Sequence, residues 1–218
     1  LARFHEVDWN DDGDIAAFVN RSCEEKRSHR SAFEKQAIVN TAWYMGMQSL
    51  FYDPQSQSLV RPAQSRKRVR LIYNLIMPYA DQQTASLGAQ QVNFEVWPAT
   101  DDQADSETAE VATDVLRYYQ DKLLWAEIEE ELDLYAVLTG EAYCKVCWDA
   151  LAGDPIDVQR LLGEERSQRW FSKRRKQDAP LTTGDLDVYA VSPLAIYWGA
   201  PGSKFENADW VIELNERT

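Results

Sequence analysis

The sequence has few of the residues that support covalent cross-links or metal sites. Three cysteines and two histidines occur among 218 residues. So small and odd a number of cysteines does not make a disulfide framework, and reduced thiols are expected. Glycine is also sparse, and its nine positions form neither a G-x-G-x-x-G loop nor a Walker-type loop, the patterns that hold phosphates. We therefore predict no cofactor and no nucleotide hydrolysis.

Long hydrophobic runs are also missing. The longest stretch, residues 71–80, is interrupted by Asn74 and Pro78 and is shorter than the roughly 18 to 20 residues that a membrane span requires. The first residues do not show the basic-then-apolar pattern of a signal peptide. We therefore expect no membrane segment and a reducing, cytoplasmic site of synthesis.

Positive charge is scarce overall. The chain holds 23 Lys and Arg against 36 Asp and Glu, a net charge of −13. Tight binding of nucleic acid requires clustered cations that neutralise phosphates, so a protein whose whole surface grips DNA is excluded. Any contact with DNA is expected to be local or weak.

The cations that do occur gather in two clusters. The first comprises Arg61, Arg66, Lys67, Arg68 and Arg70. The second comprises Arg160, Arg166, Arg169, Lys173, Arg174, Arg175 and Lys176. Trp170 and Phe171 interrupt the second cluster, a pattern typical of nucleic-acid or partner-protein surfaces. Nearby acidic residues dilute it, which favours a solvated segment or salt bridges between subunits. The candidates for a weak DNA or partner contact are Arg169, Lys173, Arg174 and Arg175.

The first part of the sequence predicts mainly helices. Asp14 is the expected N-cap of a helix that carries Ile15, Phe18 and Val19. Helical spacing continues to about Ser49, which predicts two or more helices. Residues 53–65 have no period and predict an irregular loop.

Four further elements are expected between residues 77 and 140. Pro78 fits a first helical turn, which predicts a helix over residues 77–88. Alternation over residues 92–96 predicts a half-buried strand that ends at Pro98. Acidic residues after Thr100 indicate a helix start, and a second helix follows a break near Trp125 and ends at Gly140. Five residues of the first helix are spaced as one buried seam, expected to pack on Ile128, Leu132 and Leu138: Ala109, Ala112, Leu116, Tyr119 and Leu123.

Strand patterns dominate the remainder. They cover residues 142–148, 186–191, 194–198 and 210–214, and a segment rich in both charge signs lies between the first two. Helices followed by antiparallel strands predict an α+β fold, in which N-terminal helices precede a helix pair packed on a mainly antiparallel sheet.

Few residues have the arrangement of a catalytic or metal site. Asp8 to Ile15 match the start of a calcium loop, but the closing glutamate is replaced by Val19, so a polar helix cap is favoured.

Cys144 and Cys147 have the spacing of redox or zinc sites. On a strand, however, they point to opposite faces, so packed thiols are favoured. His5 and His29 lie in no nucleophile motif, and Glu127 to Glu131 are most simply a solvated helix face. We therefore predict no enzymatic activity.

Several short patterns occur in a defined order. They are NLIMP at 74–78, VNFEVWP at 92–98, LTGEAYCKVCW at 138–148, and SPLAIYW at 192–198 followed by ENADW at 206–210. In order and spacing, this series resembles the first part of a bacteriophage portal protein. Tyr44, Gly46 and Gln48 match the close of an early portal helix, and Asn74 and Pro78 match the start of the next. One turn departs from the family, because residues 199–202 replace its usual aspartate-proline pair.

The resemblance implies a structural role. Portal proteins form a ring, typically of twelve subunits, at one capsid vertex, through which a terminase motor pumps double-stranded DNA. The implied partners are further copies of the chain, terminase, capsid or scaffold proteins, and head-completion or tail proteins, with DNA passing through rather than tightly bound. The implied place is the virion, after assembly in the host cytoplasm. An acidic conduit suits this role because it does not hold the phosphates that it passes.

The resemblance also implies a domain organisation. Residues 1–69 are expected to form an N-terminal helical segment and loop. Residues 70–218 are expected to form a wing-like α+β domain with a charged insertion at about 150–185. Portal proteins are longer, so their stem, clip and tunnel regions are expected beyond Thr218. Two alternatives stay open: another phage head-completion or tail protein, and a small redox or metal domain around Cys144 and Cys147.

Overall fold

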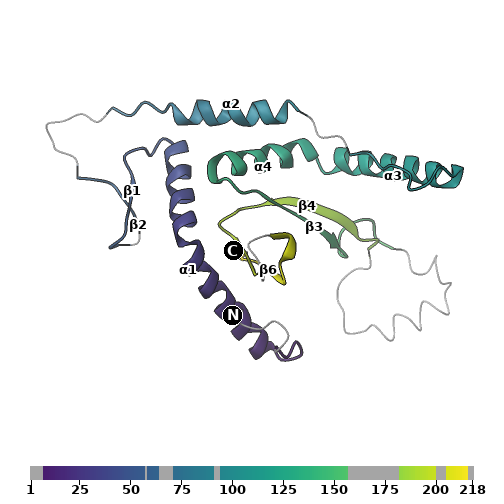
Figure 1. Ribbon diagram of the computed structural model, residues 1–218, viewed down its shortest axis with the longest axis horizontal. Coiled ribbons are helices and arrows are strands. Elements are labelled where there is room, and N and C mark those ends of the chain that lie inside the picture. Colours follow the sequence, from purple (N-terminus) through teal and green to yellow (C-terminus); the bar gives the residue numbers. More distant parts are fainter. Residues whose placement is uncertain are drawn as a thin grey trace. The chain divides into compact units, whose positions relative to one another are not determined.

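The fold is α+β, as the sequence predicts. The computed structural model describes residues 7–56, 58–63, 71–90, 94–156, 182–199 and 205–215. Within these ranges there are four α-helices and three two-stranded sheets, and three of the helices follow one another between the first and second sheets (Figure 1). The chain divides into two compact units, residues 1–143 with 190–218 and residues 144–189. No helix in the described part is long and apolar enough to cross a membrane.

Helix α1 (Asp12–Tyr44) is one uninterrupted helix. Asp11, and not Asp14, is its N-cap, and the Asp11 carboxylate accepts a hydrogen bond from the Gly13 amide at 3.2 Å. The expectation of two or more helices before Ser49 is therefore wrong. The reason is that no proline occurs between Asp12 and Tyr44 and the one glycine lies in the first turn, where it breaks nothing. Its buried side chains are Phe18, Ser22, Cys23, Ala37 and Ala42.

A small hairpin replaces part of the loop expected over residues 53–65. Strand β1 (Phe51–Asp53) pairs antiparallel with β2 (Ser58–Val60). The Asp53 carboxylate accepts hydrogen bonds from the amides of Gln55 and Ser56, at 3.1 and 3.2 Å, and so stabilises the turn. Strands of three residues are too short to show a period, which is why the pattern did not predict them.

Helices α2 (Ile76–Gly88) and α4 (Trp125–Thr139) pack together as the most extensive helix pair of the first unit (Figure 1). Ala80 and Thr84 are the buried residues of α2, and their small size allows a close approach. Helix α4 also contacts α1. Gly140 ends α4 with a φ of 84°, which confirms the predicted left-handed cap.

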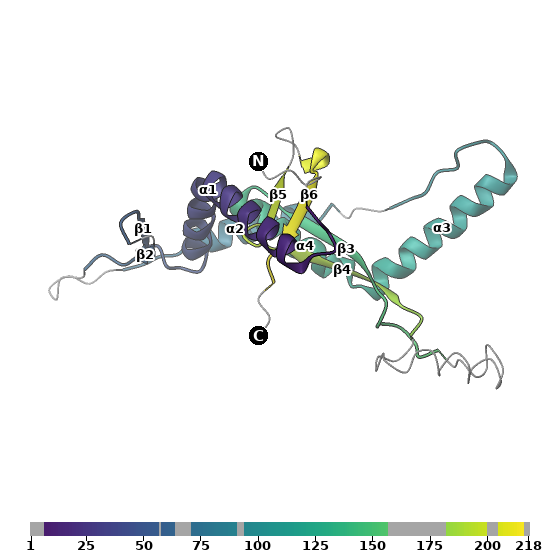
Figure 2. The same ribbon diagram turned by 90° about the horizontal axis from the view of Figure 1, so that it is seen from below.

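Helix α3 (Gln103–Lys122) forms as predicted, but its seam is not buried against α4. Ala109 and Thr113 are its buried residues, whereas Leu116 is 38% exposed. The covering element is the extended segment before α3, because the Val96 amide donates to Thr113 Oγ1 at 3.0 Å (Figure 2). This segment, residues 94–98, is not the predicted strand; its amide pairs with a side chain and not with a neighbouring strand. Val92 and Asn93 lie outside the described residues.

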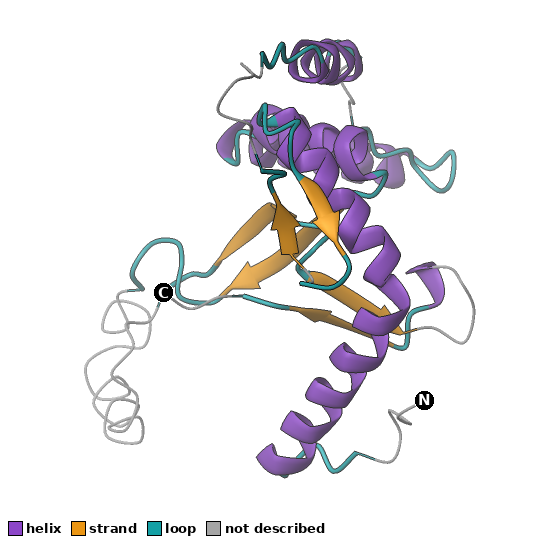
Figure 3. Ribbon diagram, turned by 90° about the vertical axis from the view of Figure 1, so that its left-hand side faces the viewer, coloured by secondary structure: helices purple, strands orange, loops and turns teal. Residues whose placement is uncertain are grey.

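The later strands form where the sequence predicts them, with shifted ends. Figure 3 shows the strands of the structure in orange. Strand β5 (Ile196–Gly199) pairs antiparallel with β6 (Trp210–Glu213) and contacts α1. Residues 192–195 form a turn, so β5 begins two residues later than expected. Tyr197 is buried, and its hydroxyl donates to Glu34 Oε1 of α1 at 3.0 Å.

The second unit is built on β3 (Tyr143–Asp149) and β4 (Asp185–Val191), which pair with each other. A side chain at Gly184, where φ is 72°, would collide with the indole of Trp148, so this turn requires glycine. An isolated antiparallel bridge between Pro155 and Thr182 closes the base of the charged insertion. Residues 157–181, which include the rest of that insertion, lie outside the described residues.

Candidate functional site

Asn74 joins the end of α1 to the start of α2. Its Nδ2 donates to the Tyr44 carbonyl at 2.9 Å, and its Oδ1 accepts from Gln48 Nε2 at 2.9 Å. The same oxygen accepts from the amides of Ile76 and Met77, at 3.1 and 3.2 Å, which would otherwise be unpaired at a helix start. Tyr44, Gln48 and Asn74, which come from two separate portal-like patterns, therefore meet in one hydrogen-bond network.

Arg30 links α1 to two later segments of the first unit. Its guanidinium donates to Glu141 Oε2 at 2.9 Å and to the Pro193 carbonyl at 3.2 Å. The Tyr143 hydroxyl donates to the same glutamate oxygen, and Trp198 Nε1 donates to that hydroxyl at 3.3 Å. The Arg30 side chain is only 14% exposed, so this network fixes α1 against the strands. No pattern in the sequence indicates this pair, because 111 residues separate Arg30 from Glu141.

A pocket of about 410 Å³ lies among α1, α2 and α4. Asp81, Glu129 and Glu130 line it together with Tyr44, whose hydroxyl donates to Asp81 at 2.7 Å. That hydrogen bond, with help from burial, raises the pKa of Tyr44. The lining, which belongs wholly to the described part of the chain, holds no histidine or cysteine.

The two cysteines of the C-x-x-C pattern lie on opposite faces of β3, as predicted. Cys144 is exposed and Cys147 is half-buried, and both are free thiols. The expectation that both are packed is therefore wrong for Cys144. Local desolvation still raises the pKa of Cys144, which disfavours the thiolate that redox chemistry and metal binding use. Within the described ranges, no group of three or more metal-binding side chains comes together.

The acidic start of the chain forms a helix cap. The Asp8 carboxylate accepts from the Asn10 amide at 3.0 Å, and Asp11 caps α1. The polar-cap interpretation of residues 8–15 is thus confirmed. His29 lies on α1, and His5 lies outside the described residues.

The predicted DNA or partner contact cannot be placed. Arg169, Lys173, Arg174 and Arg175 lie outside the described residues, as do Arg66, Lys67, Arg68 and Arg70 of the first basic cluster. Arg61 alone of that first cluster is described, and it is exposed.

Large apolar side chains are exposed on two elements of the first unit. The first set precedes or begins α2 and comprises Leu71, Ile72, Tyr73, Leu75, Met77 and Tyr79. The second set lies on α3 and comprises Val111, Val115, Leu116 and Tyr118. Clustered exposed apolar residues of this kind are typical of protein–protein contacts. Within the α3 set, Val111, Val115 and Tyr118 follow steps of four and three, a signal that is present in the sequence beside the predicted seam of the same helix.

Comparison with known proteins agrees with this picture of a structural subunit. The family model for the phage P22-like portal protein matches residues 51–178, which is more than half of the chain. Neither a search of curated proteins nor a search of solved structures finds a match. The matched range contains the portal-like patterns at 74–78, 92–98 and 138–148, whereas those at 192–198 and 206–210 lie beyond it. The chain therefore belongs to the family of phage P22-like portal proteins.

Proposed function

We propose that the chain is part of a subunit of a closed portal ring, the conduit for double-stranded DNA at one vertex of a phage capsid. The family match over residues 51–178 carries this proposal. Portal proteins are structural, so the described residues serve as scaffold and subunit interface rather than as catalysts. The ring is proposed to be a dodecamer that packages the genome and later releases it.

The charge of the chain supports a conduit. A net charge of −13 repels duplex DNA and leaves few cations to hold its phosphates. A weak contact with DNA or with a partner protein is still proposed for the second basic cluster, through Arg169, Lys173, Arg174 and Arg175. The proposed partners besides further copies are terminase, capsid or scaffold proteins, and head-completion or tail proteins, met during assembly in the host cytoplasm.

The exposed apolar side chains support assembly. A ring requires heterologous interfaces, in which one surface of each subunit meets a different surface of the next. The exposed sets before α2 and on α3 supply apolar area for such contacts. The proposed domain arrangement, an N-terminal segment over residues 1–69 and a wing-like domain over 70–218, would place both α2 and α3 in the wing.

Native mass spectrometry of the complete gene product tests the proposal. The expected result is a single closed species that contains many copies, with a mass near twelve subunits. A product that stays monomeric or dimeric at micromolar concentration would contradict the proposed function. An assembly without a fixed subunit number, such as an open filament, would also contradict it, because a conduit at one vertex must close.

A further inference from the structure

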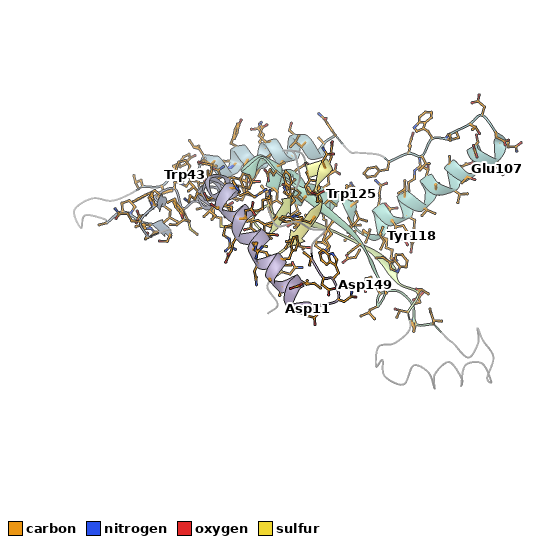
Figure 4. The ribbon with its side chains drawn as sticks, turned by 60° about the horizontal axis from the view of Figure 1, so that its bottom comes forward. Asp11, Trp43, Glu107, Tyr118, Trp125 and Asp149 are labelled. Carbon is orange, nitrogen blue, oxygen red and sulfur yellow. The ribbon has the colours of Figure 1, made fainter. Side chains whose placement is uncertain are left out.

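Helix α3 has a second apolar face that no described residue covers. Val111, Val115 and Tyr118 are 63%, 48% and 58% exposed. At about 100° per residue, these three lie roughly half a turn from Ala109 and Thr113, the side that the segment before α3 covers. Figure 4 shows Tyr118 and Glu107 projecting from opposite ends of this helix.

The spacing of this face is that of a helix-packing seam. Continuing the steps of four and three in both directions gives Ala104, Thr108, Val111, Val115, Tyr118 and Lys122. A 4-3 repeat keeps side chains on one stripe, which is the pattern that packs against a second protein surface. Lys122 lies over the rings of Tyr118 and Tyr119, 5.6 Å from each centroid, so the end of the stripe is aromatic with a cation above it.

The charges beside the stripe select its partner. Helix α3 carries five acidic side chains and two basic ones, which leaves it with an excess of negative charge. Two copies of α3 packed on each other would bring like charges together, which disfavours a symmetric contact. Duplex DNA is disfavoured for the same reason. The partner surface must therefore combine cations with apolar side chains.

Residues 160–176 have this composition. They contain seven cations against Glu164 and Glu165, together with Leu161, Leu162, Trp170 and Phe171. We propose that the exposed stripe of α3 in one subunit docks onto residues 160–176 of a neighbouring copy. The contact rests on the proposed ring, and it is heterologous because it joins two different segments of the chain. It assigns the second basic cluster to subunit contact rather than to DNA.

The test replaces one residue of the stripe. Val111→Arg in the complete gene product places a cation where a basic partner segment must approach. Because Val111 is exposed in the single chain, the melting temperature of the unassembled subunit should not change. The ring fraction at fixed subunit concentration should fall about tenfold or more, since each ~1.4 kcal/mol lost at an interface is a factor of ten in affinity. The matched control is Ser106→Arg, which adds the same charge about 140° around the exposed surface of α3 and should assemble as wild type.

A charge exchange identifies the partner segment. Glu107 and Asp114 flank the stripe, so Glu107→Lys with Asp114→Lys should weaken the ring. Adding Arg174→Glu and Arg175→Glu should restore it. If the two α3 substitutions weakened the ring and the two arginine substitutions did not restore it, another surface would cover α3. That result would overturn this inference. A Val111→Arg ring as stable as the wild-type ring would also overturn the proposed contact, but it would leave the proposed function intact. A wild-type protein that forms no ring would overturn both the contact and the function.

Discussion

The junction of α1, α2 and α4 differs sharply from α3, although all four helices belong to the same unit. At the junction, Asn74 and Arg30 join segments far apart in sequence through hydrogen bonds of 2.9 to 3.2 Å. Helix α3 contacts α4 and the short segment before it, and its outer face is exposed. The junction is therefore held together by contacts within one chain. The outer face of α3 is exposed in the described part of the chain, which is typical of an element that is completed by another molecule.

The difference also shows what helical periodicity measures. The spacing of apolar residues on α3 predicts that the helix has a buried face, and it does, at Ala109 and Thr113. Periodicity does not identify the covering element, which proved to be residues 94–97 and not α4. In the described part of the chain, the segment before α3 covers one apolar stripe of this helix, and the other stripe is exposed. We propose that the second stripe is covered by a neighbouring subunit.

Replacement of two arginines offers the largest contrast between the regions. Arg30→Ala leaves Glu141 without its cation and the Pro193 carbonyl without its donor, and should destabilise by about 3 kcal/mol. Arg117→Ala removes an exposed pair with Asp114 on α3 and should cost less than about 0.5 kcal/mol. Urea denaturation of both variants measures the two free energies of unfolding. Equal costs would show that α1 is not anchored through Arg30.

Within α3, two aspartate substitutions separate the covered side from the edge. Ala109→Asp places a charge at a buried position and should destabilise by about 2 kcal/mol. Leu116→Asp should cost less than about 1 kcal/mol, because that side chain is 38% exposed. Thermal unfolding compares the pair directly. If Leu116→Asp were the more destabilising, the predicted seam against α4 would exist after all.

Asn74→Ala tests the link between α1 and α2. The substitution removes the oxygen that accepts from the first two amides of α2, together with the hydrogen bonds to Tyr44 and Gln48, so a loss of about 1 to 2 kcal/mol is expected. Gln103→Ala, which breaks an exposed bond to Glu107 on α3, is the matched control and should cost a few tenths at most, about 0.3 kcal/mol. If Asn74→Ala left the free energy of unfolding unchanged in the same urea titration, the hydrogen bonds of Asn74 would not stabilise the junction of α1 and α2.

The smallest effect is expected at the cysteines. Cys144→Ser with Cys147→Ser should leave the free energy of unfolding within about 0.5 kcal/mol of wild type, since neither thiol is buried. Assembly should be intact, and no zinc should copurify. Stoichiometric zinc in wild type that the double variant loses, measured by elemental analysis, would restore the metal-domain alternative.

The sequence predicted local features well because their signals are local. The break before Trp125, the left-handed Gly140 and the alternating strand β3 each depend on a few adjacent residues. It did not predict the Arg30–Glu141 pair, since nothing near either residue identifies a partner 111 positions away. It missed the β1–β2 hairpin because strands of three residues carry no period. The order of short portal-like patterns, in contrast, identified the family that the family model then confirmed.

Cryo-electron microscopy of the complete gene product is the sharpest test of the proposed ring, because it shows both the symmetry and the position of each helix. We expect a closed ring with a central channel, with the Val111–Tyr118 face of α3 at the boundary between neighbouring subunits. Single subunits, dimers or open filaments would contradict the ring. A closed ring with this face of α3 in solvent would contradict the interface.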